Sequence, residues 1–180
     1  MTDEEFFTFC QLNDTLDFER DSERNIIFMS PTGSQTGIIN LIIGSRLLNW
    51  NESNQFPGYC FDSSTGFLMP NNAVRSPDAA WVKKERWVAL SDEQKETFAP
   101  LCPDFVVEVR SKTDSLTYLK DKMSEYLANG CRLGWLIDRL EKKTYIYRPN
   151  KEVEVIETFE FVLTGEDVLP DFVFDLKRIQ

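Results

Sequence analysis

One carboxylate lies in a stretch of sequence that is otherwise apolar. Residues 103–110 read Pro-Asp-Phe-Val-Val-Glu-Val-Arg and Ser111 follows, a pattern typical of a buried central strand. An isolated ionised carboxylate at Glu108 would cost several kcal/mol in that setting unless a cation compensated its charge. The sequence therefore predicts a positively charged partner next to Glu108.

Asp78 is a second carboxylate at the edge of an apolar run. It follows Ser-Pro and opens Ala-Ala-Trp-Val at residues 79–82, about thirty residues before Glu108. Carboxylates on neighbouring strands often hold a hard divalent cation, because Mg²⁺ prefers one or two carboxylates together with waters and phosphate oxygens. The pair predicts a site for Mg²⁺ or Mn²⁺, and metal-assisted hydrolysis of a phosphodiester is the leading hypothesis.

Length and composition favour one globular domain over residues 1–180. Of the 180 residues, 42% are hydrophobic, which is enough for one well-developed core. The chain has no basic-then-apolar leader pattern, and polar residues interrupt its apolar stretches, so neither secretion nor membrane spanning is expected. The four cysteines show no C-x-x-C pair or zinc-ligand spacing and are interpreted as reduced thiols of a cytoplasmic protein.

The residue types present limit the chemistry. The chain contains no histidine, which excludes Ser-His and Cys-His catalysis and imidazole general bases. The formal net charge of -10 argues against broad affinity for nucleic acid, because such binding releases counterions from phosphates to Lys and Arg. Basic residues within 83–86 and 110–122, each group following one of the two carboxylates, either line a small positive cleft or are solvated surface charges.

The first half of the chain predicts a hairpin and a helix. Residues 16–20 and 25–29 are compatible with two short strands, and apolar residues recur at helical spacing over residues 35–51. This helix is expected to be largely buried. Further along, Ser91 and Gln94 have the S-x-x-Q spacing of a capping box, which predicts a short helix there.

The Glu108 strand is followed by a second amphipathic helix and another strand. Asp114 or Ser115 can cap the helix, and Gly130 can end it. Residues 134–138 then read as a buried strand, so that strand, helix and strand form a βαβ unit. The predicted fold class is mixed α/β, with a central sheet flanked by helices.

Several short motifs occur together in an order that resembles a known family. They are Met-Ser-Pro-Thr-Gly at 29–33, Phe-Asp-Ser-Ser-Thr-Gly-Phe at 61–67, Arg-Ser-Pro-Asp-Ala at 75–79, Cys-Pro-Asp-Phe-Val-Val-Glu-Val-Arg-Ser at 102–111, Lys-Met at 122–123, Asn-Gly at 129–130 and Leu-Gly-Trp-Leu-Ile-Asp at 133–138. On these residues the chain resembles the restriction-endonuclease-like family of uncharacterised bacterial proteins, a branch of the PD-(D/E)xK nuclease superfamily. The resemblance covers nearly the whole chain.

The resemblance implies a restriction-endonuclease-like core, with a metal site built from Asp78 and Glu108 and DNA as the substrate. In the superfamily, the residue after the glutamate can lend its backbone carbonyl to the metal, and that residue is Val109 here. Asp104 is the less favoured candidate for the motif aspartate, because it stands only four residues before Glu108 at the entrance to the same strand.

The motif lysine is where this chain departs from the pattern. It should stand two residues after the glutamate, where the chain has Arg110, and an arginine stays protonated and cannot deprotonate water. The resemblance implies that the lysine has moved to Lys122 on the following helix. Lys122 lies three residues after Leu119 and four before Tyr126, beside the stripe expected to face the sheet. A surface lysine that only borders the core is the alternative.

The leading hypothesis is thus a Mg²⁺-dependent DNA endonuclease. Asp78 and Glu108 would hold the metal. Lys122 would orient the attacking water or stabilise negative charge, and Arg110 would assist on the phosphate.

Other assignments stay open. Glu19 and Gln35 are candidate additions to the site, although a solvent-exposed role is favoured for both.

The main alternative function is that of a binding or assembly module built on a nuclease fold, and the net charge and Arg110 favour it. A third is a structural protein in which Glu108 pairs with Arg110 or Lys122. A homodimer would let two sites address two strands.

Overall fold

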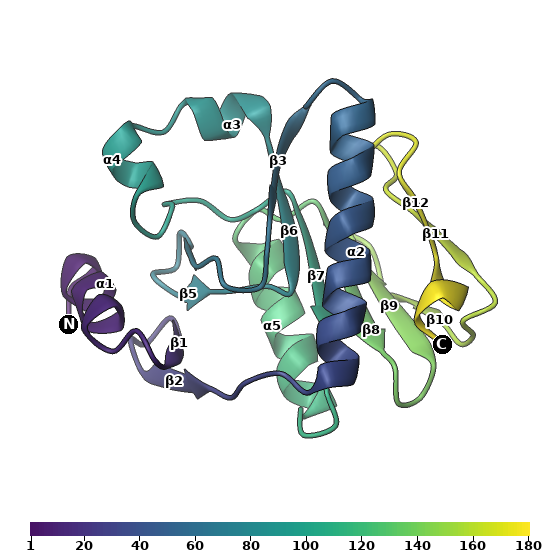
Figure 1. Ribbon diagram of the computed structural model, residues 1–180, viewed down its shortest axis with the longest axis horizontal. Coiled ribbons are helices and arrows are strands. Elements are labelled where there is room, and N and C mark those ends of the chain that lie inside the picture. Colours follow the sequence, from purple (N-terminus) through teal and green to yellow (C-terminus); the bar gives the residue numbers. More distant parts are fainter.

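A six-stranded mixed sheet forms the centre of the protein. The computed structural model describes all of residues 1–180, and the strands follow the order β10-β9-β8-β7-β6-β3 (Figure 1). Their bounds are Gly58–Phe61 for β3, Ala79–Lys83 for β6, Phe105–Val109 for β7, Leu133–Asp138 for β8, Lys143–Tyr147 for β9 and Glu154–Ile156 for β10. Strands β7 and β8 are parallel, and the other neighbours are antiparallel. The predicted mixed sheet is confirmed.

Two long helices cover opposite faces of this sheet. Helix α2 spans Ser34–Ser53 and lies on the near side in Figure 1, whereas α5 spans Leu116–Ala128 and lies behind the strands. Helix α5 connects the parallel strands β7 and β8, so the predicted βαβ unit is present. Ser115 caps α5 by accepting a hydrogen bond from the Tyr118 amide, and Gly130, at a φ of 103°, follows its end.

The alternation of β7 sends its side chains to both helices. Phe105 and Val107 belong to the apolar core on the α2 side, and Val106 belongs to the core on the α5 side. Successive residues of a strand point to opposite faces. Glu108 therefore lies on the α5 face, two residues beyond Val106.

A smaller sheet lies on the left of Figure 1, next to the N-terminal helix α1. Its order is β2-β1-β5-β4. The bounds are Asp3–Leu12 for α1, Asp17–Arg20 for β1, Ile26–Met29 for β2, Phe67–Leu68 for β4 and Val74–Arg75 for β5. Strands β1 and β2 form the predicted hairpin. Because β5 leads into the segment before β6, the small sheet approaches the central one there.

The remaining elements are short. They are α3 at Lys84–Val88, α4 at Asp92–Lys95, β11 at Val162–Thr164, β12 at Val173–Asp175 and a 3₁₀ helix at Leu176–Ile179. Ser91 and Gln94 form the predicted capping box at the start of α4. Strands β11 and β12 pair with each other and add Leu163 and Phe174 to the core on the α2 side.

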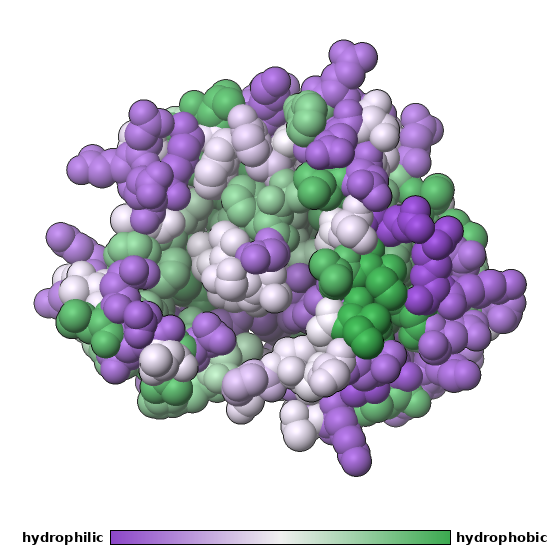
Figure 2. Space-filling view, viewed as in Figure 1, coloured by the Kyte–Doolittle hydropathy of each residue, from purple (hydrophilic) through white to green (hydrophobic).

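Helix α2 is less buried than its sequence predicts. Ile39, Ile43 and Leu47 are core residues, but Ile38 is 53% exposed and Leu41 is 73% exposed. The sheet covers only one side of the helix, whereas the apolar residues surround more than half of it. Figure 2 shows the result as an apolar patch over the lower part of α2. No helix combines the length and the apolar character that a membrane crossing requires.

Candidate functional site

Glu108 has the cationic partner that its sequence context predicts. The carboxylate is 4% exposed on the α5 face of β7. Its Oε1 atom lies 2.8 Å from Lys122 Nζ and accepts a hydrogen bond of 2.9 Å from the Tyr126 hydroxyl. Both partners come from α5, where their separation of four residues places them on one side of the helix.

Lys122 bridges two carboxylates. Its side chain is 2% exposed, and Nζ lies 2.8 Å from Glu108 Oε1 and 2.8 Å from Glu19 Oε1. The Ser76 carbonyl oxygen is a third acceptor at 3.5 Å. The alternative of a surface lysine is therefore wrong: the helical spacing brings this side chain inward, into contact with the Glu108 strand.

Glu19 is also part of this cluster, contrary to the solvent-exposed role favoured from the sequence. It is fully buried on β1, accepts a hydrogen bond of 2.8 Å from the Ser76 amide, and pairs with Arg75 at 3.2 Å. Three of the four residues of β1, Glu19 among them, are buried, so an alternation of buried and exposed residues along this short strand does not reveal which of them faces the cluster. Its burial results from the pairing of β1 with β5.

Asp78 lies at the entry to β6, next to β7. Its Oδ2 atom accepts a hydrogen bond of 2.7 Å from the Val109 amide, and its Oδ1 atom accepts one of 2.6 Å from Nδ2 of Asn40 on α2. The register Ala79 with Val107 places the two strands so that this contact forms. Asn40 was missed in the sequence, where it reads only as a polar interruption in an apolar helix.

The buried charges shift one another's pKa values. Burial raises the pKa of Glu108 to about 7; Lys122 opposes this shift, and the negative charges of Asp78 and Glu19 add to it. Burial also raises the pKa of Asp78, against the Val109 hydrogen bond. Burial alone would raise the pKa of Glu19, but Lys122 and its other partners lower it overall.

Lys122 remains protonated in this cluster. Burial would lower the pKa of its ammonium, but the adjacent carboxylates of Glu108 and Glu19 outweigh burial and raise that pKa. A permanently charged ammonium donates hydrogen bonds and stabilises negative charge, but it cannot accept a proton from water.

Arg110 does not join these residues. Its Nη1 atom lies 2.7 Å from Asp138 Oδ2 at the end of β8, and Nε donates to the Asp114 carbonyl oxygen at 3.3 Å. The parallel pairing of β7 with β8 brings this carboxylate beside the arginine, a neighbour that the local sequence does not specify.

Two other candidates lie outside the cluster. Asp104 is buried. It accepts a hydrogen bond of 2.8 Å from the Lys83 amide and forms an ion pair of 3.0 Å with Arg86, so it links the start of β7 to β6 and α3. Gln35 is exposed near the start of α2.

The free acceptor atoms fit a hard divalent cation that keeps waters. No three Asp, Glu, Cys or His side chains converge as a ready-made metal site, because Lys122 stands between two of the carboxylates. The partners of Glu108 all contact Oε1, and each oxygen of Asp78 has one donor. Each carboxylate oxygen can accept more than one contact. Asp78 and Glu108 can therefore still supply oxygen ligands to Mg²⁺ or Mn²⁺, which completes its coordination with waters.

Comparison with known proteins identifies the family of the chain and a solved structure of similar fold. The model of the Uma2 family, described as "Putative restriction endonuclease", matches residues 3–177. The chain belongs to this family. The protein is also similar to the crystal structure of "a putative nuclease belonging to DUF820" from Anabaena variabilis ATCC 29413, with 20% identity over 90% of this chain and 88% of that chain and a TM-score of 0.77. No curated protein matches.

Membership in the Uma2 family confirms the resemblance drawn from the motifs. The structural likeness, at its low identity, shows the fold, and this fold is the predicted mixed sheet flanked by helices. The family description supports a nuclease-like function for the chain.

Proposed function

We propose that this Uma2 protein is a metal-dependent endonuclease that hydrolyses phosphodiester bonds of DNA. The main support is that Lys122 Nζ on α5 lies 2.8 Å from the Glu108 carboxylate on β7, and that Asp78, just before β6, is near enough for its charge to raise the pKa of Glu108. Carboxylates and a buried ammonium gathered at the ends of neighbouring strands are expected where charge must be organised around a phosphate. The family description is consistent with this chemistry.

Asp78 and Glu108 would hold Mg²⁺ or Mn²⁺, with the Val109 carbonyl as a further candidate ligand. A bound divalent cation acidifies a water and neutralises phosphate charge. Lys122 would contribute a fixed positive charge and not act as a base, because its pKa is raised by Glu108 and Glu19. Glu19 would hold the lysine in position from the opposite side.

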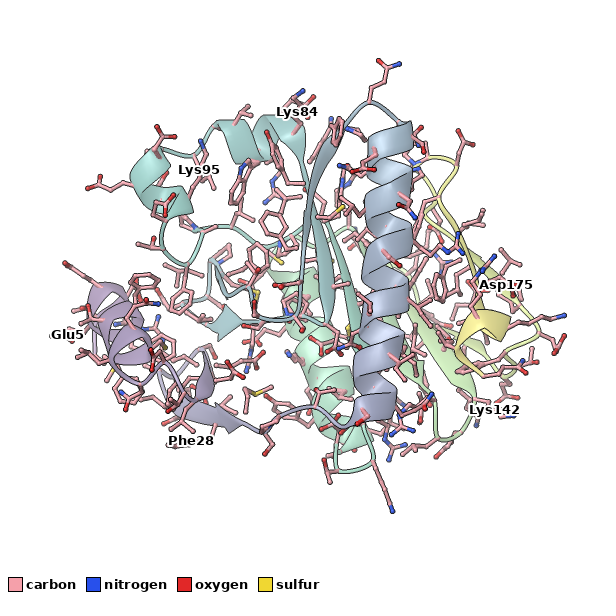
Figure 3. The ribbon with its side chains drawn as sticks, in the orientation of Figure 1. Glu5, Phe28, Lys84, Lys95, Lys142 and Asp175 are labelled. Atoms are coloured by element: carbon pink, nitrogen blue, oxygen red, sulfur yellow. The ribbon has the colours of Figure 1, made fainter.

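Few cationic side chains are free near this cluster. Lys122 is paired with Glu19 and Glu108, and Arg110 is paired with Asp138. Lysines such as Lys84, Lys95 and Lys142 lie at the edge of the molecule in Figure 3. With a formal net charge of -10, the protein should bind DNA through few phosphate contacts, and its affinity should depend only weakly on salt.

A binding or assembly module on the same fold is the second candidate. The exposed apolar residues of α2, with Leu41 73% exposed, favour this function, because exposed apolar patches often contact other macromolecules. The Glu108–Lys122 ion pair does not discriminate between the two functions, since it would also stabilise an inactive descendant.

Cleavage of supercoiled plasmid and of single-stranded DNA with Mg²⁺ or Mn²⁺ tests the nuclease proposal. We expect metal-dependent cleavage by the parent protein and its loss in Asp78→Asn, Glu108→Gln and Lys122→Met. Lys120→Met is the matched control on α5 and should retain activity. A folded parent that cleaves neither substrate with either metal would favour the binding module. Full activity in Lys122→Met would remove the lysine from the mechanism.

A further inference from the structure

Asn40 contacts the candidate site from α2. It follows the core residue Ile39, so its side chain lies at the border of the buried face of the helix. From there Nδ2 donates a hydrogen bond of 2.6 Å to Asp78 Oδ1. Asn40 is thus the contact between α2 and a carboxylate that is otherwise held by the backbone of β7.

The other end of this amide lacks a partner. Asn40 Oδ1 is buried and accepts no hydrogen bond. The amide cannot be turned over to correct this, because its oxygen would then face the Asp78 carboxylate, and two acceptors would be in contact. Buried acceptors nearly always have a protein or water partner. The Oδ1 atom therefore indicates a donor that binds beside Asp78.

A hydrated divalent cation would supply that donor. With two protein carboxylates as ligands, Mg²⁺ keeps several waters, and each water bound to a cation is a strong hydrogen-bond donor. Outer partners of this kind fix the ligands and typically change metal affinity by about 10- to 100-fold.

We propose that Asn40 is a positioning residue of the metal site: its Nδ2 group orients Asp78, and its Oδ1 atom accepts a hydrogen bond from a water bound to the cation. This inference rests on the proposed metal-dependent function. It assigns two separate tasks to the two ends of one amide, and substitutions can separate them.

Titration of the intact protein with Mn²⁺ by calorimetry tests this assignment without using activity. Asn40→Leu removes both ends of the amide, whereas Asn40→Asp keeps an acceptor oxygen and loses the donor. Asn49→Leu makes the same change at an exposed position of the same helix and serves as the matched control. Asp78→Asn removes a proposed ligand. Urea unfolding in EDTA checks that each variant is folded.

We expect Asn40→Leu to weaken Mn²⁺ binding by about tenfold or more, Asn40→Asp to bind closer to the parent, and Asn49→Leu to match the parent. Parent-like binding by folded Asn40→Leu, together with loss in Asp78→Asn, would overturn the role of Asn40 and leave the nuclease proposal standing. Binding by Asn40→Asp as weak as that of Asn40→Leu would show that only the donor matters and would overturn the water-holding role. Absence of Mn²⁺ binding by the parent would overturn both proposals.

Discussion

Replacement of Lys122 by methionine tests the electrostatic organisation of the cluster. The substitution keeps a long apolar stem but removes the ammonium, which lies 2.8 Å from both Glu19 and Glu108. Glu19 would keep Arg75 and the Ser76 amide. Glu108 would keep only the Tyr126 hydroxyl, so most of the loss should arise at Glu108.

Removing one partner of a buried ion pair typically costs about 3–5 kcal/mol, because the remaining charge is left uncompensated. We expect a decrease of this size in the free energy of unfolding at pH 8, measured by urea denaturation in EDTA. Glu108 has a pKa of about 7 even with Lys122 present, so without the lysine it should keep a proton above pH 7. Because the folded variant then binds a proton that the unfolded chain does not, its stability should fall by about 1.4 kcal/mol per pH unit there. The decrease in the free energy of unfolding caused by Lys122→Met should therefore be smaller at pH 6 than at pH 8.

Two further variants make this prediction refutable. Lys120→Met, on the same helix, removes only a half-buried ammonium that lies 4.3 Å from the centre of the Tyr145 ring, and should cost about 1 kcal/mol or less. Addition of Glu108→Gln to Lys122→Met should restore part of the stability, because the uncompensated charge is removed. The reasoning is refuted if Lys122→Met is as mild as Lys120→Met, or if the double variant is no more stable than Lys122→Met.

Three other perturbations have defined outcomes. Tyr126→Phe removes the hydroxyl that donates to Glu108 and should cost about 1–3 kcal/mol; an unchanged urea midpoint would contradict this. In the metal-free parent, the Glu108 pKa of about 7 exceeds its ordinary value of 4.5, so the folded state binds more protons and Glu108 should lower stability by about 3 kcal/mol as pH rises from 4.5 to above 7; an equal pH slope in Glu108→Gln would refute this. Gly58→Ala would place a Cβ atom against the Val82 carbonyl oxygen, and this overpacking should lower the free energy of unfolding by about 1–3 kcal/mol. A melting temperature equal to that of the parent would show that β3 can shift at little cost.

Local sequence was sufficient for the residues whose chemistry conflicts with their surroundings. Glu108 was identifiable because a charge interrupts a buried run, and its cationic partner followed from the cost of burial. Lys122 was identifiable because helical spacing relates it to a neighbouring apolar stripe, together with the family resemblance. The hairpin, the capped helices and the βαβ unit likewise depend on interactions between residues close in the chain.

Long-range pairing decided the rest. Glu19 is buried because β1 pairs with β5, and Arg110 meets Asp138 because β7 and β8 are parallel neighbours. Asn40 reaches Asp78 because α2 packs across the sheet, 38 residues away in sequence. The apolar run around Glu108 was enough to identify this residue as a buried charge that needs compensation, whereas nothing near Glu19 in the sequence predicted its burial. The partners of Glu19 and Asp78 depend on the folded structure, since they come from segments that become neighbours when the helices and sheets assemble.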